Sequence, residues 1–199
     1  MDGISGSGAL PLFHHSIIVR VRRKSGGDGD VTIKLRGTDL ILPDSWSEPV
    51  EGEGPQAFTV YCLDRKSGKI LWQRAAVTGQ AKIKRHPKST HANPTPATDG
   101  KTLVVSFGSE GLFAFDFSGK QLWTKDFGIL DSGYYVVPAA QWGFASSPVI
   151  QDGKVIIQAD VQKNSFVAAL DLATGKELWR TPRTDVPTFG SPAVLPYTG

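Results

Sequence analysis

Six cationic or imidazole side chains gather between residues 77 and 93, and they are the clearest candidates for chemistry in this sequence. They are Lys82, Lys84, Arg85, His86, Lys88 and His91. Ammonium and guanidinium groups attract anions, so the segment is a candidate site for an anionic ligand. His86 and His91 are five residues apart with no third ligand beside them, and no metal site is predicted. The alternative is that the segment only bridges two structural units.

A second segment, residues 128–144, is rich in aromatic and amide side chains. They are Tyr134, Tyr135, Gln141 and Trp142. Such groups suit a planar or carbohydrate-like ligand, although we favour packing between structural units for the aromatic rings. Each segment leads directly into an expected strand that lies near a central channel. We therefore predict that Asn93 and Ser146 lie near one mouth of that channel. The candidate ligand-binding residues are Lys84, Arg85, His86, His91, Asn93, Gln141, Trp142 and Ser146.

Covalent catalysis finds little support. The single cysteine, Cys62, lies in the alternating apolar run Phe58–Leu63, where a buried thiol behaves as a small hydrophobic side chain, and no disulfide can form within the chain. A serine hydrolase is expected to carry a Gly-x-Ser-x-Gly turn, and none occurs. No catalytic residue is assigned.

A repeated motif indicates how these segments are positioned. Residues 62–72 read CLDRKSGKILW and residues 169–179 read ALDLATGKELW, while a shorter copy, AFDFSGKQLW, occupies 114–123. The aspartate and glycine favour a tight turn in which the carboxylate bonds backbone amides and glycine takes a positive φ. The tryptophan is expected to cover the neighbouring unit. The structural repeat residues are Asp64, Gly68, Trp72, Asp116, Gly119, Trp123, Asp171, Gly175 and Trp179.

Each repeat is predicted to contain four short strands. Asp99-Gly100 and Asp152-Gly153 separate paired apolar runs, which is the pattern of a two-residue hairpin. The predicted strands are 95–98, 102–107, 112–117 and 121–125 in one unit, and 148–150, 155–159, 166–170 and 177–180 in the next. Four antiparallel strands in each repeat, with a repeat length equal to the spacing of Trp72, Trp123 and Trp179, are typical of a β-propeller blade. The predicted fold is all-β, a partial β-propeller with about three to four blades.

Composition excludes several classes of protein. The chain has 199 residues, of which 40% are hydrophobic and 21% charged, as in globular and not in disordered proteins. No run of about 18 apolar residues occurs, so no transmembrane segment is predicted. The net charge of +3 is too small to indicate a nucleic-acid partner.

With its repeated motif the chain resembles the pyrroloquinoline-quinone (PQQ)-like β-propeller repeat family, in the quinoprotein alcohol dehydrogenase-like group. The signature Ala-x-Asp-x-x-[Thr/Ser]-Gly-x-x-x-Trp is met from Ala169 to Trp179, and with Cys for Ala from Cys62 to Trp72. The resemblance covers about residues 58–194. For the dehydrogenases it implies PQQ and Ca²⁺, with a vicinal Cys–Cys pair beside the quinone. A single cysteine cannot supply that pair, so no cofactor is expected, and PQQ with Ca²⁺ is the alternative.

The repeats divide the chain unevenly. Residues 1–57 are interpreted as a disordered start, strands of a degenerate first blade, and an acidic loop. The propeller region is interpreted as outer strands at 58–76, full blades at 93–127 and 146–182, and the start of another blade at 190–199. Closed propellers contain about 4–8 blades, so the chain is expected to be a fragment or to associate with further blades.

The favoured function is a non-catalytic binding or assembly module, whose partner is a protein or the remaining blades of a ring; a small ligand is compatible with it. The alternatives are a portion of a quinone-dependent alcohol dehydrogenase, and a carbohydrate-binding or hydrolytic propeller.

Relatives in the family are commonly exported. The first residues form a poor secretory signal, because they lack a basic segment and His14 and His15 interrupt their apolar stretch. No compartment is assigned.

Overall fold

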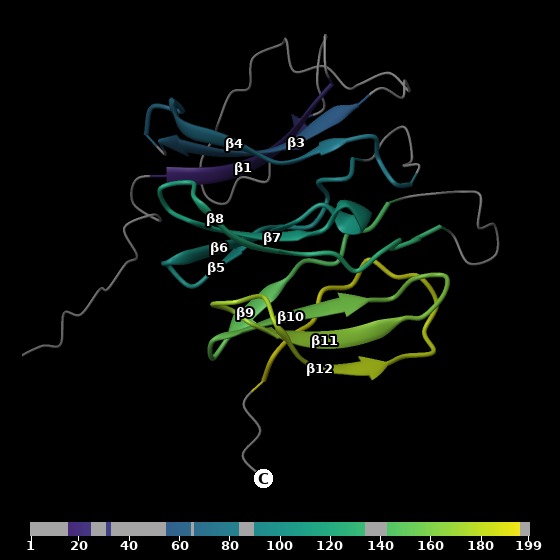
Figure 1. Cartoon of the computed structure of the whole chain (residues 1–199). Helices are drawn as coiled ribbons and strands as arrows, with labels where there is room; N and C mark the ends of the chain where they lie inside the picture. The colour runs from purple at the N-terminus through teal and green to yellow at the C-terminus, as the bar shows by residue number, and fades with distance from the viewer. Residues whose placement is uncertain are drawn as a thin grey trace, which may run out of the picture.

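The computed structural model describes residues 16–24, 31–32, 55–64, 66–83, 90–133 and 143–195. Within these ranges the strands form three four-stranded antiparallel sheets, which are stacked in chain order (Figure 1). The helical structure there is a single 3₁₀ turn, η1 (Gly108–Glu110). The prediction of an all-β fold made of partial propeller blades is confirmed.

Each sheet is one blade. In blades 2 and 3 neighbouring strands are consecutive along the chain, whereas in blade 1 the second strand lies at the edge of the sheet, beside the first. Blade 1 has the order β2–β1–β3–β4, from β1 (Ser16–Lys24), β2 (Val31–Thr32), β3 (Gln56–Asp64) and β4 (Ile70–Gly79). Blade 2 contains β5 (Ala97–Thr98), β6 (Thr102–Ser106), β7 (Leu112–Asp116) and β8 (Gln121–Lys125). Blade 3 contains β9 (Val149–Gln151), β10 (Lys154–Ala159), β11 (Phe166–Asp171) and β12 (Glu177–Pro182). The acidic loop expected at 44–54 lies outside the described residues.

The two Asp-Gly hairpins differ from each other. Asp152 and Gly153 both have positive φ, 48° and 69°, and they join strands that pair directly at Gln151 and Lys154, as predicted for a two-residue turn. In blade 2 the last pair is Thr98 with Leu103, so that loop is longer. There the Asp99 carboxylate accepts the amides of Lys101 and Thr102 at 2.9 and 2.7 Å, which replaces the predicted geometry by a side-chain-capped turn.

The first strands of blades 2 and 3 begin later than predicted. Strand β5 begins at Ala97 and not at Thr95, and β9 begins at Val149 and not at Pro148. Proline has no N–H to donate to a ladder, and the Thr95 amide donates to the Ser147 hydroxyl instead of to its own sheet. These residues therefore lead into the strand without joining it.

Blade 2 is buried on both faces, which explains its nearly continuous apolar strands. Because side chains alternate along a strand, Leu103 and Phe113 pack with Phe58 of blade 1, while Val104 and Leu112 pack with blade 3. Removing apolar surface from water at both joints is the main stabilising contribution to the stack. A middle blade thus depends on both of its neighbours.

The tight turns between the third and fourth strands form as predicted. In blade 3 the Asp171 carboxylate accepts the Thr174 amide at 2.9 Å and the Thr174 hydroxyl at 2.6 Å. In blade 2 the Asp116 carboxylate accepts the Ser118 hydroxyl at 2.6 Å and the Lys120 amide at 3.0 Å, even though this copy is one residue shorter. The hydroxyl hydrogen bond is the largest cause that lowers the pKa of each of these aspartates.

The repeated tryptophans join consecutive blades. The Trp123 indole lies against Gly175 of blade 3 and donates its Nε1–H to the Leu172 carbonyl at 2.8 Å. In the same way Trp72 lies against Gly119 of blade 2 and donates to the Phe117 carbonyl at 2.9 Å. In both joints the indole spans to the blade that follows and covers its turn glycine.

Alanine at position 175 is expected to destabilise the chain more than alanine at position 68. Gly175 and Gly68 have φ of +70° and +68°, so both variants carry a left-handed backbone penalty of about 1–2 kcal/mol. A Cβ at 175 would lie 2.6 Å from the Trp123 ring, whereas no described atom lies within 4 Å of a Cβ at 68. Urea denaturation measures the free energy of unfolding of each variant, and equal losses would contradict the contact.

Truncating the covered tryptophan is expected to cost more than truncating an uncovered one. Trp123 is 8% exposed, and Trp123→Ala should lower the free energy of unfolding by about 3–5 kcal/mol. Trp179 is 44% exposed, so Trp179→Ala should cost about 1 kcal/mol. Thermal unfolding of both variants compares them, and an unchanged melting temperature for Trp123→Ala would mean that the indole does not hold the joint.

Candidate functional site at the loop end and the open face

The long connections between blades all lie at one end of the blades, because consecutive strands run in opposite directions. Because the strands alternate in direction, the Asp turns and Asp-Gly turns share one end, and the connections between blades share the other with the β6–β7 and β10–β11 loops. We call the second end the loop end. The described parts of the connections there are 80–83 with 90–96, 126–133 with 143–148, and the segment after β12, which we call connector 3 (residues 183–190).

Three of the predicted ligand-binding residues fall in the described part of the chain. His91 is buried with its ring edge-on to Phe58, at a centroid distance of 6.0 Å. Asn93 lies in the same turn and accepts the Thr90 amide at 3.3 Å. Ser146 belongs to another connection; it is 4% exposed, and its Oγ has no hydrogen-bond partner in the part of the structure that is described. The other five predicted residues lie outside the described ranges: Lys84, Arg85, His86, Gln141 and Trp142.

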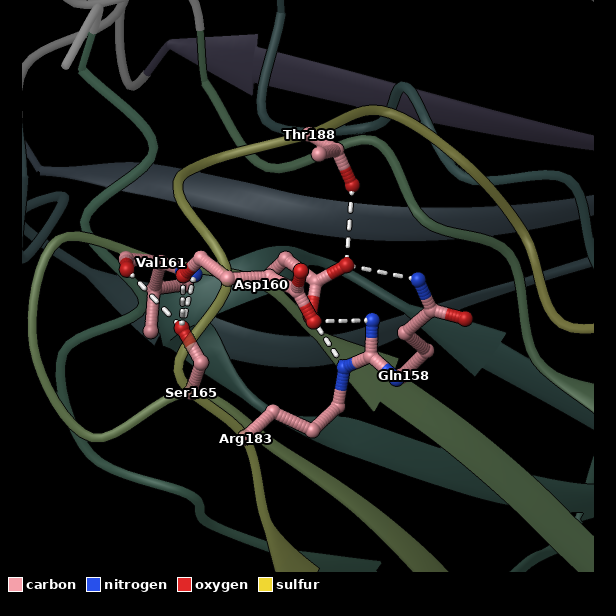
Figure 2. Close-up of polar contacts among 7 residues, drawn as sticks. Gln158, Asp160, Val161, Ser165, Arg183 and Thr188 are labelled. Carbon is pink, nitrogen blue, oxygen red and sulfur yellow. Dashed lines mark hydrogen bonds and ion pairs between the residues drawn. The ribbon is translucent and has the colours of Figure 1, made fainter.

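A buried carboxylate that the sequence did not indicate holds connector 3 in place. Asp160 follows β10 and is 2% exposed. Its Oδ1 accepts Arg183 Nε at 2.7 Å, and its Oδ2 accepts Gln158 Nε2 at 2.6 Å and Thr188 Oγ1 at 3.0 Å. Figure 2 shows these three donors converging on the carboxylate from different sides. Asp160 therefore links the β10–β11 loop to both ends of connector 3.

The charge state of Asp160 follows from these contacts. Burial raises the pKa of this carboxyl group, but the hydrogen bonds from Arg183, Gln158 and Thr188 and the positive charge of Arg183 together outweigh it. The pKa of Asp160 therefore lies below its ordinary value. Arg183 also forms an ion pair with Asp185, which is exposed.

Ser165 adds a second attachment for connector 3. The Ser165 hydroxyl accepts the Val161 amide at 2.9 Å and lies 3.0 Å from the Asp185 carbonyl, to which it donates. The Arg183 amide donates to the Ser165 carbonyl at 2.7 Å. The β10–β11 loop and connector 3 are thus joined through both side chains and backbone.

The same kind of attachment occurs at the other connections. In blade 2 the Ser109 hydroxyl accepts the Leu130 amide at 2.9 Å, which ties this blade's loop to the connection that leaves it. Glu110 accepts the Lys82 amide at 2.6 Å, which ties the loop to the connection that arrives from blade 1. Burial raises the pKa of Glu110, and the Lys82 hydrogen bond offsets only part of this effect.

Blade 3 is also hydrogen-bonded to the connection that precedes it in the chain, as blade 2 is. Gln162 donates its amide to the Asp131 carbonyl at 2.8 Å and its side-chain Nε2 to the Gly133 carbonyl at 2.6 Å. Each loop of blades 2 and 3 therefore holds the connection before it and the connection after it. Connector 3 is held from its own side by Asp160 and Ser165.

The face of blade 3 that points away from blade 2 is the open face of the described structure. Trp179 on β12 is 44% exposed, and on connector 3, which follows β12, Val186 and Phe189 are 49% and 51% exposed. Val155 and Phe166 point the other way, into the core shared with blade 2. We define the open face as Trp179 together with connector 3. On this face Trp179 is the counterpart of Trp72 and Trp123, whose indoles lie against the turn glycine of the next blade.

In the ranges described above, no group of three or more His, Cys, Asp or Glu side chains is placed to hold a metal ion. None of the helical structure in those ranges is long and apolar enough to cross a membrane.

Four-stranded antiparallel blades joined by an indole on a turn glycine define the class, which is the PQQ-like β-propeller. A family model described as "Outer membrane protein assembly factor BamB" (PQQ_2) matches residues 56–198. The chain belongs to this family. The resemblance expected from the repeated motif is thereby confirmed.

Individual relatives extend this comparison. The chain is 29% identical over 202 residues to quinohemoprotein alcohol dehydrogenase ADH IIB of Pseudomonas putida, an alignment that covers 99% of this chain and 22% of that protein. Among solved structures it is similar to a europium-containing methanol dehydrogenase, with a TM-score of 0.45, 19% identity, and coverage of 65% of this chain and 22% of that one. BamB from Moraxella catarrhalis gives a TM-score of 0.32 and 17% identity, with coverage of 66% and 50%. The chain therefore spans only part of the length of each of these proteins.

Replacing Asp160 by asparagine tests the attachment of connector 3. Because the folded-state pKa lies below the unfolded value of about 3.9, the ionised group stabilises the fold above that pH, and this contribution is lost as the pH falls through the folded-state pKa. At pH 7 Asp160→Asn should lose about 1.5–3 kcal/mol of unfolding free energy, and the gap to the parent chain should narrow below about pH 4. Urea denaturation from pH 7 to pH 3 measures both values.

The matched control for this variant is Asp185→Asn. Asp185 is exposed and pairs with the same Arg183, so its loss should change the free energy of unfolding by less than about 1 kcal/mol at pH 7. A gap between Asp160→Asn and the parent chain that stays constant from pH 7 to pH 3 would contradict an ionised Asp160.

Proposed function

We propose that this chain is a non-catalytic PQQ-like propeller module that works by docking: its open face binds a further blade or a partner protein that presents an equivalent surface. The observation that carries the proposal is the difference between two equivalent tryptophans. Trp123 is covered by the glycine turn of the next blade, whereas Trp179 has the same place in its repeat and is 44% exposed. An apolar ring in this position is stabilised by a covering surface.

The composition of the open face supports contact with another protein surface. It combines Trp179 with Val186 and Phe189 on a connector whose backbone is already fixed from one side by Asp160 and Ser165. A fixed connector loses little conformational entropy on binding, which favours association. The assembly role in the description of the family is consistent with such a module.

A portion of a quinone-dependent alcohol dehydrogenase is the second candidate. The 29% identity to a quinohemoprotein alcohol dehydrogenase over nearly the whole chain favours it. The Ca²⁺ that accompanies PQQ takes about 6–8 oxygen ligands in one place, and the described ranges hold no group of three His, Cys, Asp or Glu side chains placed for a metal ion. No step through that cofactor is derived for this chain.

The state of association tests the docking face. The chain at micromolar concentration is expected to sediment as oligomers, and the double variant Trp179→Ser with Phe189→Ser should shift it toward monomer, because the apolar contact is removed. The matched control is Leu122→Ser, since Leu122 is similarly exposed, at 43%, but belongs to β8 of blade 2 and not to the open face. Monomers with a sharp melting transition in the parent chain would contradict the docking role.

Titration with PQQ and Ca²⁺ separates the two candidates. The proposed module should show neither saturable micromolar binding nor dye-linked alcohol oxidation after mixing with both. Saturable binding together with oxidation would overturn the non-catalytic role and establish the dehydrogenase alternative.

A further inference from the structure

A second type of contact joins the blades, where their first strands come together. Strands β5 and β9 belong to different sheets and lie close to each other. Just before them the Thr95 amide of blade 2 donates to the Ser147 hydroxyl of blade 3 at 2.7 Å. The Ser147 amide in turn donates to the Ser191 hydroxyl at 2.9 Å. The three residues thus form two consecutive steps of a hydrogen-bond ladder.

The residues of the ladder share one sequence feature. Thr95, Ser147 and Ser191 are each followed by proline. Proline favours an extended conformation in the residue before it and has no N–H of its own. The amide of that residue is then turned out of its own sheet, and the hydroxyl on the same residue is left to accept from the blade before. One residue can therefore both donate forward and accept from behind.

We propose that this Ser/Thr–Pro dipeptide is the positioning element of the blade joint, and that Ser191 holds the next step open for a Ser or Thr hydroxyl from the following segment. Its own amide has no acceptor among the residues that the structure describes. The inference rests on the proposed docking function and specifies the partner: a blade whose first strand begins with Ser-Pro or Thr-Pro. The carboxylate and amide contacts at the loop end cannot specify a partner blade in this way. The residues that make them differ between the joint of blades 1 and 2 and the joint of blades 2 and 3.

The existing step can be tested in the chain as it stands. Ser147→Ala removes the acceptor of the Thr95 amide, so hydrogen exchange of that amide should accelerate about tenfold or more. Ser147→Thr keeps a hydroxyl and should restore slow exchange, which a role in packing alone would not predict. Exchange at Val104, in the middle of β6, serves as the internal reference for global stability. An unchanged Thr95 rate in Ser147→Ala would overturn the proposal.

The open step can be tested by lengthening the chain with its own repeat. Val194 and Ile150 are equivalent when Ser191-Pro192 is aligned with Ser147-Pro148, so a second copy of residues 151–194 can follow Val194 directly. In this longer chain the Ser191 amide should exchange about tenfold more slowly than in the parent chain. Alanine in the added copy of Ser191 should abolish that protection, and threonine there should keep it.

Tryptophan fluorescence of the same longer chain separates the two levels of the proposal. The added copy of Gly175 should cover Trp179 and shift its emission to shorter wavelength. If Trp179 is covered but the Ser191 amide exchanges equally fast with serine or alanine in the added copy, the ladder is wrong and the docking function stands. If Trp179 stays exposed, the docking function fails, and the Thr95 exchange in Ser147→Ala alone decides whether the ladder exists.

Discussion

The stacking of an indole ring on the turn glycine of the next blade is the contact on which this structure depends. It requires a residue without Cβ, since a Cβ at Gly119 or Gly175 would come within 3 Å of the ring. It also requires the turn to keep its shape, because the indole N–H donates to the carbonyl directly after the turn aspartate. The aspartate, the hydroxyl residue and the glycine of the motif therefore act together on a tryptophan that comes from another blade.

Stability in such a stack is shared between neighbours. Blade 2 buries apolar side chains toward blade 1 and toward blade 3, so neither joint can be removed without exposing half of its core. The joint between blades 2 and 3 is fixed at four places: by tryptophan near the turns, by the apolar strands in the middle, by the Thr95–Ser147 hydrogen bond beside the first strands, and by glutamine contacts at the loop end. Blade 3 has all four on this side, and on its other side Trp179 remains half-exposed.

The sequence was informative where the repeat makes the chemistry periodic. The Asp152-Gly153 hairpin, the Asp turns and the tryptophan joint could be predicted, because each needs a particular residue type at a particular spacing. The Asp99 hairpin differs from the prediction because the choice between two turn geometries depends on a side-chain hydrogen bond that no pattern encodes. Asp160 was not predicted because its partners Arg183 and Thr188 lie 23 and 28 residues away. The sign that could have indicated it is an aspartate directly after an apolar strand.

The same reasoning explains why the fold of this family is easier to read than its function. The residues of the motif sit at the turn end and at the joints, where they serve any propeller of this kind, whether it assembles proteins or oxidises alcohols. Differences in activity must then come from the loop end, where connections are long and no period constrains them. In this chain the described loop end uses its buried carboxylates, Glu110 and Asp160, to hold connections in place. Groups committed to backbone and guanidinium donors in this way serve the geometry of the blades, which is why the proposed partner contact is placed at the surface between blades and not at these carboxylates.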